Sequence, residues 1–159
     1  VAGQVAINAV LIMLVSSSGA VAALGDTLFP AASLREGLGA DLASSSHILV
    51  RLRTIHPVLA IASAFALMSA AWRMAQKGTP DSGRLARALM ACVVVQLIAG
   101  ASNVVLLAPV WLQLVHLLLA DTVWILFVLL AASVMATSPA GWSARPVSSV
   151  RALRQNAAT

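Results

Sequence analysis

Four long apolar segments constrain the fold of this chain more than any other feature of its sequence. They lie near Gln4–Leu24, His47–Trp72, Ala88–Ala108 and Trp111–Thr137. Each has the length of about 20 residues that an α-helix needs to cross the hydrocarbon core of a bilayer. Of the 159 residues, 60% are hydrophobic and only 9% are charged, whereas a soluble domain carries about 25% charged residues. The sequence therefore predicts an all-α, polytopic membrane protein, built as a four-transmembrane-helix bundle.

The charged residues predict how these helices are oriented in the membrane. Basic residues gather between the second and third segments and again after the fourth, and the positive-inside rule places both stretches in the cytoplasm. We expect a multi-pass protein of the cell (plasma) membrane with both termini cytoplasmic. Residues 1–137 would form the transmembrane domain and 138–159 a basic cytoplasmic tail. The net charge of +5 does not indicate nucleic acid, because these side chains flank the bilayer and meet anionic lipid headgroups. The basic residues of these two stretches are Arg73, Lys77, Arg84, Arg87, Arg145, Arg151 and Arg154.

The first outer connection, residues 25–46, is long and carries more acidic than basic side chains. Within it, Ser33 and Glu36 form a capping-box pattern, which is typical of the start of a helix. Three leucines then repeat every fourth residue, as one face of a short amphipathic helix would. We predict an extracytoplasmic surface helix here, and a plain loop is the alternative. The leucines are Leu34, Leu38 and Leu42.

Two histidines lie inside the membrane-length segments, His56 in the second and His116 in the fourth. An imidazole in hydrocarbon is costly and usually faces the interior of a bundle, so each is a candidate functional residue. Both segments run from outside to inside, and the helical rise places the two histidines at depths of about 13 Å and about 8 Å. We predict that they are axial ligands of one haem iron. The chain has no CxxCH motif, so the haem would be held non-covalently.

Several polar residues precede or follow His56 closely in the sequence. His47 lies nine positions earlier, about 180° away around a helix, so we expect it at the interface or at a helix start. Arg51 and Arg53 lie near the outer surface, where a guanidinium can pair with a haem propionate. The alternative is that both arginines snorkel to the interface. Pro57 removes a backbone donor and predicts a kink near Arg53.

Other polar and small residues within the segments are interpreted as helix-packing residues. Gln96 and Asn103 are seven positions apart and share a face of the third segment, with Gly100 between them. Small residues at 16–20 in the first segment allow close helix approach. Asp121 lies five residues after His116 and could hydrogen-bond the far ring nitrogen of a ligating histidine. The favoured interpretation is structural pairing with an arginine or with polar groups of another helix. The segments carry no serine triad, zinc signature or paired carboxylates, so any chemistry would come largely from a bound cofactor.

Three stretches of the chain resemble one family, haem A synthase, and in particular its carboxy-terminal four-helix half. They are ALGDTLFPA in the first outer connection, HILVRLRTIHPVLA in the second segment and QLIAGASNVVLLAPVWLQLVHLLLADTVW across the last two segments. The resemblance implies two similar four-helix halves, each with a histidine from its second and fourth helices. It also implies oxidation of a methyl group of haem O to the formyl group of haem A, with haem B as a cofactor, for cytochrome oxidase assembly.

The chain departs from the pattern of the catalytic half of that family. That half has a glutamate one turn before the second-helix histidine, where this chain has Arg53, and an arginine after the histidine, where it has Pro57. The departures favour the cofactor-haem half, and no catalytic residue is assigned. The start at Val1 fits a fragment of an eight-helix protein. Its partner would be an N-terminal four-helix half or a second copy of the chain, with haem O synthase and oxidase assembly factors as further partners.

Two other functions stay open on the sequence alone. A bis-histidine b-type cytochrome subunit for electron transfer would carry the same pair of ligands, and it differs in the identity of its haem. A haem-free scaffold or small transporter is the third possibility. Transporters usually have broken helices and polar groups at the midplane, and this chain has few of them.

Overall fold

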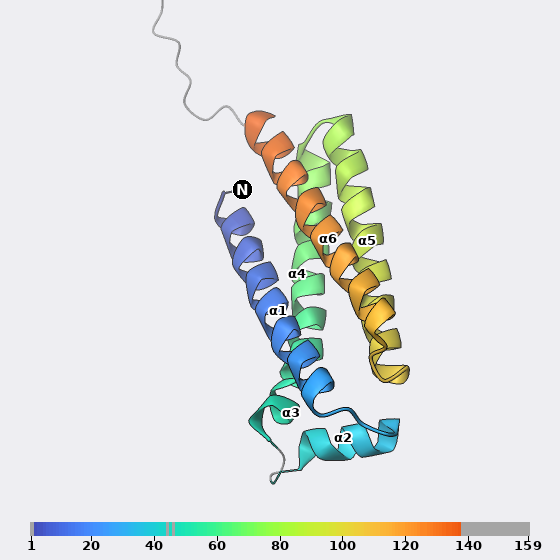
Figure 1. Ribbon diagram of the computed structural model, residues 1–159. Helices are drawn as coiled ribbons and strands as arrows, with labels where there is room; N and C mark the ends of the chain where they lie inside the picture. The colour runs from blue at the N-terminus through green and yellow to red at the C-terminus, as the bar shows by residue number, and fades with distance from the viewer. Residues whose placement is uncertain (1, 44, 46, 138–159) are drawn as a thin grey trace, which may run out of the picture.

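The computed structural model describes residues 2–43, 45 and 47–137, and this part of the chain is helical without strands (Figure 1). It confirms the predicted all-α fold, because four helices are long and apolar enough to cross a membrane. The predicted basic tail, 138–159, lies outside the described residues. The helices are α1 (Ala2–Leu28), α2 (Leu34–Leu42), α3 (Ile48–Leu52), α4 (Ile55–Lys77), α5 (Pro80–Val105) and α6 (Val110–Thr137).

The long helices alternate in direction, so the bundle has two chemically different ends. The start of α1, the turn between α4 and α5 and the end of α6 lie together at one end, while α2, α3 and the turn between α5 and α6 lie at the other (Figure 1). We call the first the basic end, because it carries Arg73, Arg84 and Arg87. We call the second the acidic end, because the acidic residues of the outer connection lie there. The two described termini are therefore on the same side of the bundle.

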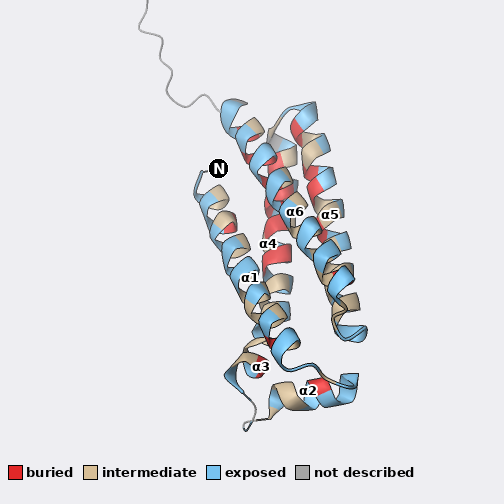
Figure 2. Ribbon diagram, viewed as in Figure 1, coloured by how far each residue is buried: buried red, intermediate tan, exposed pale blue. Residues whose placement is uncertain are grey.

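The main hydrophobic cluster lies in the half of the bundle toward the basic end. There α4, α5 and α6 pack against one another through small and aliphatic side chains, and Figure 2 shows the buried positions concentrated in this half. Both histidines lie in the other half, which this core cluster does not fill. The cluster consists of Ala64, Leu67, Ala71, Met74, Ala86, Leu89, Val93, Val123, Phe127, Leu130 and Val134.

The predicted surface helix of the outer connection is present as α2. Ser33 is its N-cap and its hydroxyl accepts from the backbone N–H of Glu36 at 3.3 Å. The carboxylate of Glu36 accepts in return from the backbone N–H of Ala32 at 3.1 Å, one residue before the cap. The repeating leucines of α2 point outward instead of into the bundle, with exposed fractions of 39%, 50% and 83%. The apolar face of α2 is thus available to the membrane surface.

The second predicted span is interrupted in the structure. The sequence predicted one segment over 47–72, but α3 ends at Leu52 and α4 begins at Ile55. Pro57 explains the break, because its ring nitrogen cannot donate to the carbonyl of Arg53 four residues earlier. Instead, the backbone N–H and the hydroxyl of Thr54 both bond the carbonyl of Arg51, at 3.4 Å and 2.8 Å.

Arg53 stands at this break and ties the acidic end together. Its guanidinium donates to Asp26 at the end of α1 (3.0 Å), to Asp41 of α2, and to the backbone carbonyl of Gly37 (3.3 Å). The Arg53 side chain is only 11% exposed, so these interactions are shielded from water. We call this set the Arg53 latch, since one cation joins the helices α1 and α2 to the α3–α4 junction.

Replacing Arg53 by alanine should detach α2 from the bundle. Losing one partner of a buried ion pair costs several kcal/mol, and the partial exposure of Asp26 reduces the expected loss to about 2 kcal/mol. Backbone amides of α2 should then exchange with deuterium at least about tenfold faster, since a cost of about 1.4 kcal/mol already gives a factor of ten.

Arg51→Ala is the matched control, because that side chain is exposed and two residues away. Its α2 amides should exchange at the wild-type rate. If the α2 amides exchange at the same rate in the alanine variants of Arg51 and Arg53, the latch does not hold this helix.

Candidate functional site

The two membrane-embedded histidines meet in the interior of the acidic half. His56 comes from the first turn of α4 and His116 from the second turn of α6, and both helices run from the acidic to the basic end. Their ring centroids are 6.5 Å apart, and the ring planes are nearly perpendicular at 87°. The structure thus brings together the two residues that the sequence singled out.

Hydrogen bonding to α1 fixes the orientation of the His56 ring. The Ser18 hydroxyl donates to the carbonyl of Val15 at 2.8 Å, so its proton is already used. It must therefore accept from Nδ1 of His56, which lies 3.0 Å away. A neutral imidazole protonated at Nδ1 keeps its lone pair on Nε2. His56 is consequently held in the tautomer whose Nε2 lone pair is available to a hydrogen-bond donor or to a metal ion.

A glycine lies directly against each of the two rings. A Cβ added at Gly19 of α1 would be 3.0 Å from Cε1 of His56, and one added at Gly100 of α5 would be 3.1 Å from Cε1 of His116. These separations are shorter than ordinary carbon–carbon contacts, so a larger residue would push the ring. In each antiparallel helix pair, α1–α4 and α5–α6, the second helix therefore supplies a histidine that lies against a glycine of the first.

His116 is less well satisfied than His56. Its Nε2 lies 3.4 Å from the amide nitrogen of Gln96, which is a long contact, and its Nδ1 is buried without a hydrogen-bond partner. Within the described residues, Gln96 Oε1 and Asn103 Oδ1 on the neighbouring α5 are also buried and unpartnered. Each such atom costs about 1–3 kcal/mol. The cost would fall if a bound group drew these side chains into new hydrogen bonds.

The residues present fit a haem held between two imidazoles. Imidazole nitrogens bind metal ions at about 2 Å, so two rings on opposite sides of one ion have centroids about 6 Å apart. The observed separation of 6.5 Å agrees with this arrangement. No group of three or more His, Cys, Asp or Glu side chains is placed to hold a metal ion among the described residues. Two imidazoles from separate helices are a donor pair that haem iron accepts as axial ligands.

The other predicted cofactor contacts lie toward the acidic end. Arg51 is exposed on α3, whereas all three guanidinium nitrogens of Arg53 are engaged in the latch. His47 caps α3, where its Nδ1 accepts from the backbone N–H of Leu49 at 3.3 Å, and its ring stacks on Phe29 at 4.9 Å. The prediction that His47 is a helix-start residue is confirmed.

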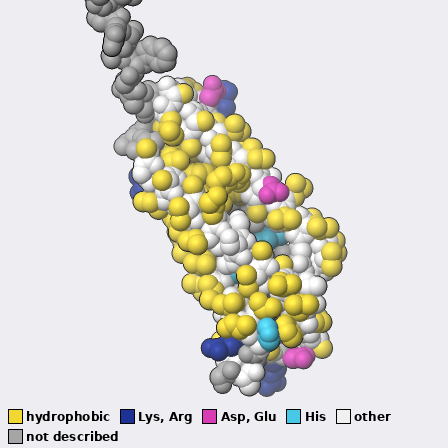
Figure 3. Space-filling model, turned by 60° about the vertical axis from the view of Figure 1, so that its left-hand side comes forward, with side chains coloured by type: hydrophobic (Ala, Val, Ile, Leu, Met, Phe, Trp, Pro, Cys, Tyr) yellow, Lys and Arg dark blue, Asp and Glu magenta, His cyan; other side chains and the backbone are white. Residues whose placement is uncertain are grey.

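Asp121 projects from the exposed surface of α6, in the middle of the span. The expected pairing partner is not found among the described residues. Figure 3 shows how apolar this surface is: hydrophobic side chains cover most of the face in view, and charged ones lie mainly toward its ends. A carboxylate at mid-depth on such a surface is costly in lipid.

Sequence reasoning singled out the two histidines and the packing role of their neighbours, but not the contacts between these neighbours and the imidazole rings. Ser18 and Gly19 were interpreted as helix-packing residues of the first segment, and Gln96 and Gly100 as packing residues of the third. All four do lie between helices, but each contacts an imidazole. The available signal was a glycine and a polar residue in the membrane span that precedes the span of each histidine.

Two curated proteins are similar in sequence to most of this chain. The chain is 45% identical over 125 residues to the protoheme IX farnesyltransferase of one strain of Thermus thermophilus, and 44% identical over 125 residues to that of a second strain. In each case the match covers 78% of this chain but only 21% of the relative. No solved structure matches the chain.

The fold and site define a four-helix membrane domain that brings two imidazoles together from its second and fourth spans. The profile of the COX15-CtaA family, described as cytochrome oxidase assembly protein, matches residues 1–128. The chain therefore belongs to this family, the haem A synthase family. The resemblance noted in the sequence is confirmed.

Adding one methyl group at either glycine should disturb the histidine pair. We expect Gly19→Ala and Gly100→Ala each to lower the free energy of unfolding by about 1–3 kcal/mol through overpacking against the ring, measured by thermal unfolding in detergent. Gly3→Ala is the control, because nothing lies within 4 Å of a Cβ at that position of α1. If Gly3→Ala lowers the free energy of unfolding as much as the other two substitutions do, the contacts with the imidazole rings are not the cause.

Proposed function

We propose that this chain is the haem-binding membrane domain of a haem A synthase, with His56 and His116 as axial ligands of a non-covalently bound haem B. The observation that carries the proposal is the separation of the two rings, which matches ligation of one iron from both sides. Family membership supports a role for haem, since the family acts in haem A synthesis and cytochrome oxidase assembly.

The side chains around the rings support this role in distinct ways. Ser18 keeps the His56 ring in the tautomer that presents Nε2, and Gly19 and Gly100 let the two rings lie close to their helices. The hydrophobic cluster lies toward the basic end, and we place the haem in the other half, between the helix pairs that carry the two histidines. The haem would supply one-electron redox chemistry, while the chain binds and orients it.

The complete enzyme would oxidise a methyl group of haem O to the formyl group of haem A, and we assign this chain to its cofactor-haem half. Arg53 occupies the position of the glutamate expected in the catalytic half, and it is bound to two carboxylates in the latch. The relatives that carry the name farnesyltransferase are much longer proteins, and the matched segment covers only 21% of their length. We therefore attribute haem binding, and not farnesyl transfer, to the segment that this chain shares with them.

Contacts of Arg51 and Arg53 with haem propionates stay a prediction. Arg51 is exposed and has a side chain that can reach toward a carboxylate. Arg53 would have to share its guanidinium between a propionate, Asp26 and Asp41. Of the two arginines, Arg51 is therefore the better candidate for a direct propionate contact.

The exposed carboxylate of Asp121 supports the proposal that α6 packs against a further membrane domain. A carboxylate in mid-span needs a donor, and a neighbouring helix can supply one. The partner would be an N-terminal four-helix half or a second copy of this chain. The basic end, with Arg73, Arg84 and Arg87, would face the cytoplasm.

Substitution of the ligands tests the function directly. We expect His56→Ala and His116→Ala each to abolish the bis-histidine haem spectrum of the purified protein, because one axial bond is lost in each case. His47→Ala is the control and should retain the spectrum, since His47 only caps α3. A full Soret band in either of the first two variants would overturn the assignment.

Extraction of the bound haem distinguishes a synthase from a b-type cytochrome subunit. The complete synthase should release haem O or haem A besides haem B. Haem B alone, from a complete protein that is expressed together with haem O synthase, would support the electron-transfer function instead.

A further inference from the structure

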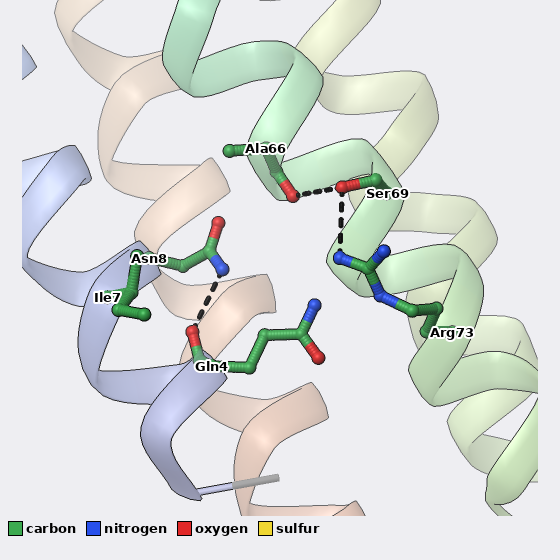
Figure 4. Close-up of a pocket in the computed structure, with 6 residues that line it drawn as sticks. All are labelled: Gln4, Ile7, Asn8, Ala66, Ser69 and Arg73. Atoms are coloured by element: carbon green, nitrogen blue, oxygen red, sulfur yellow. Dashed lines mark hydrogen bonds between the residues drawn. The ribbon is translucent and has the colours of Figure 1, made fainter.

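A second polar site lies between α1 and α4 near the basic end, in the half of the bundle that does not contain the histidines. It is an open groove of about 370 Å³ (Figure 4). Polar side chains from both helices converge on it, and an isoleucine and an alanine form its apolar wall. Its lining residues are Gln4, Ile7, Asn8, Ala66, Ser69 and Arg73.

Asn8 provides an unused hydrogen-bond acceptor in this groove. Its side-chain nitrogen donates to the backbone carbonyl of Gln4 at 2.9 Å, whereas its oxygen Oδ1 is buried and has no partner. The residue as a whole is only 3% exposed. A buried acceptor of this kind is costly unless a donor reaches it. A ligand with a hydroxyl group would remove the cost.

Arg73 provides a positive charge on the opposite wall of the groove. Its Nη2 donates to the hydroxyl of Ser69 at 3.2 Å. With the amide of Gln4 turned so that its oxygen faces the guanidinium, this oxygen accepts from Nη2 at 2.6 Å and from Nε at 3.0 Å. Both of these partners are neutral, and no ion pair of Arg73 occurs among the described residues. The groove therefore has an uncompensated positive charge.

The two polar walls lie at nearly the same distance from the basic end of the bundle. Asn8 is six residues from the start of α1 and Arg73 is four residues from the end of α4, which correspond to about 9 Å and about 6 Å at the helical rise. This is the level at which lipid headgroups meet their acyl chains. The lining residue Ile7 and the deeper Val10 of α1 are largely exposed, at 62% and 55%, so an apolar surface runs from the groove along α1.

We propose that this groove binds the headgroup of an anionic glycerophospholipid that carries hydroxyl groups, such as phosphatidylglycerol. The phosphate accepts from Arg73, a headgroup hydroxyl donates to Oδ1 of Asn8, and an acyl chain lies along Ile7 and Val10. A headgroup lying across the groove makes both polar contacts, since they are at similar depth. Phosphatidylcholine is bound less well, because its headgroup is zwitterionic and has no hydroxyl donor.

Lipid titration of the purified full-length chain tests this proposal. Added phosphatidylglycerol should raise the thermal unfolding midpoint and appear as a retained adduct in native mass spectrometry, whereas phosphatidylcholine should do so only at about tenfold higher concentration. Inorganic phosphate should not displace the lipid, because the free anion lacks the acyl chain. Displacement by millimolar inorganic phosphate would show that the groove is a simple anion site and would overturn the lipid assignment.

Two groove variants and one control separate specific binding from general attraction to a basic surface. Arg73→Gln should weaken phosphatidylglycerol binding at least tenfold. Arg84→Gln should leave it unchanged, because Arg84 lies at the same end but pairs with Asp81 at 3.1 Å in an exposed ion pair. An equal loss in both variants would contradict the groove as the site.

Asn8→Leu keeps the proposal testable apart from effects on folding. Because Oδ1 of Asn8 has no partner, this variant should unfold no earlier than the wild type without lipid, yet lose several-fold in affinity for phosphatidylglycerol. If this variant binds phosphatidylglycerol as tightly as the wild type does, Asn8 does not contact a headgroup hydroxyl, which contradicts this part of the proposal. Tight binding of a water-soluble quinone analogue, without preference for phosphatidylglycerol, would assign the groove to a quinone and overturn the proposal.

Discussion

An imidazole ring surrounded by hydrocarbon needs partners for its two nitrogens, and the four long helices are arranged in a way that supplies some of them. The Nδ1–H of His56 donates to the Ser18 hydroxyl of α1 at 3.0 Å, while His116 has only a long contact with Gln96. Nε2 of His56 and Nδ1 of His116 have no hydrogen-bond partner from the described polypeptide. Ligation of one metal by both rings would supply a partner to a nitrogen of each ring.

The bundle divides into a half that is packed with apolar side chains and a half that polar interactions hold together. Side chains of α4, α5 and α6 fill the basic half and give the helices their mutual positions. In the acidic half, specific polar interactions take over this task, chiefly the Arg53 latch and the contacts of the histidines.

Much of this architecture could be predicted from the sequence, because membrane spans and buried histidines are signalled by local composition. The four spans, the helix start at His47 and the capping box at Ser33 needed no knowledge of neighbouring helices. The break at Arg53 and Thr54 was predicted only as a kink, since the sequence does not show that two acidic residues would bind the arginine there. The roles of Ser18 and Gly100 depend on which helices are adjacent, and that information is absent from a single sequence.

The turn between α5 and α6 has a consequence for the height of His116. Leu107 and Ala108 adopt left-handed backbone angles, with φ of 59° and 51°, and Ala108 donates to the carbonyl of Asn103 at 2.7 Å. Such a turn is strained for non-glycine residues but very short. The turn lies midway in sequence between Gly100 and His116. It therefore sets the register of α5 against α6 that places the two residues side by side. One extra residue here would rotate the imidazole by about 100° away from its glycine and from the ring of His56.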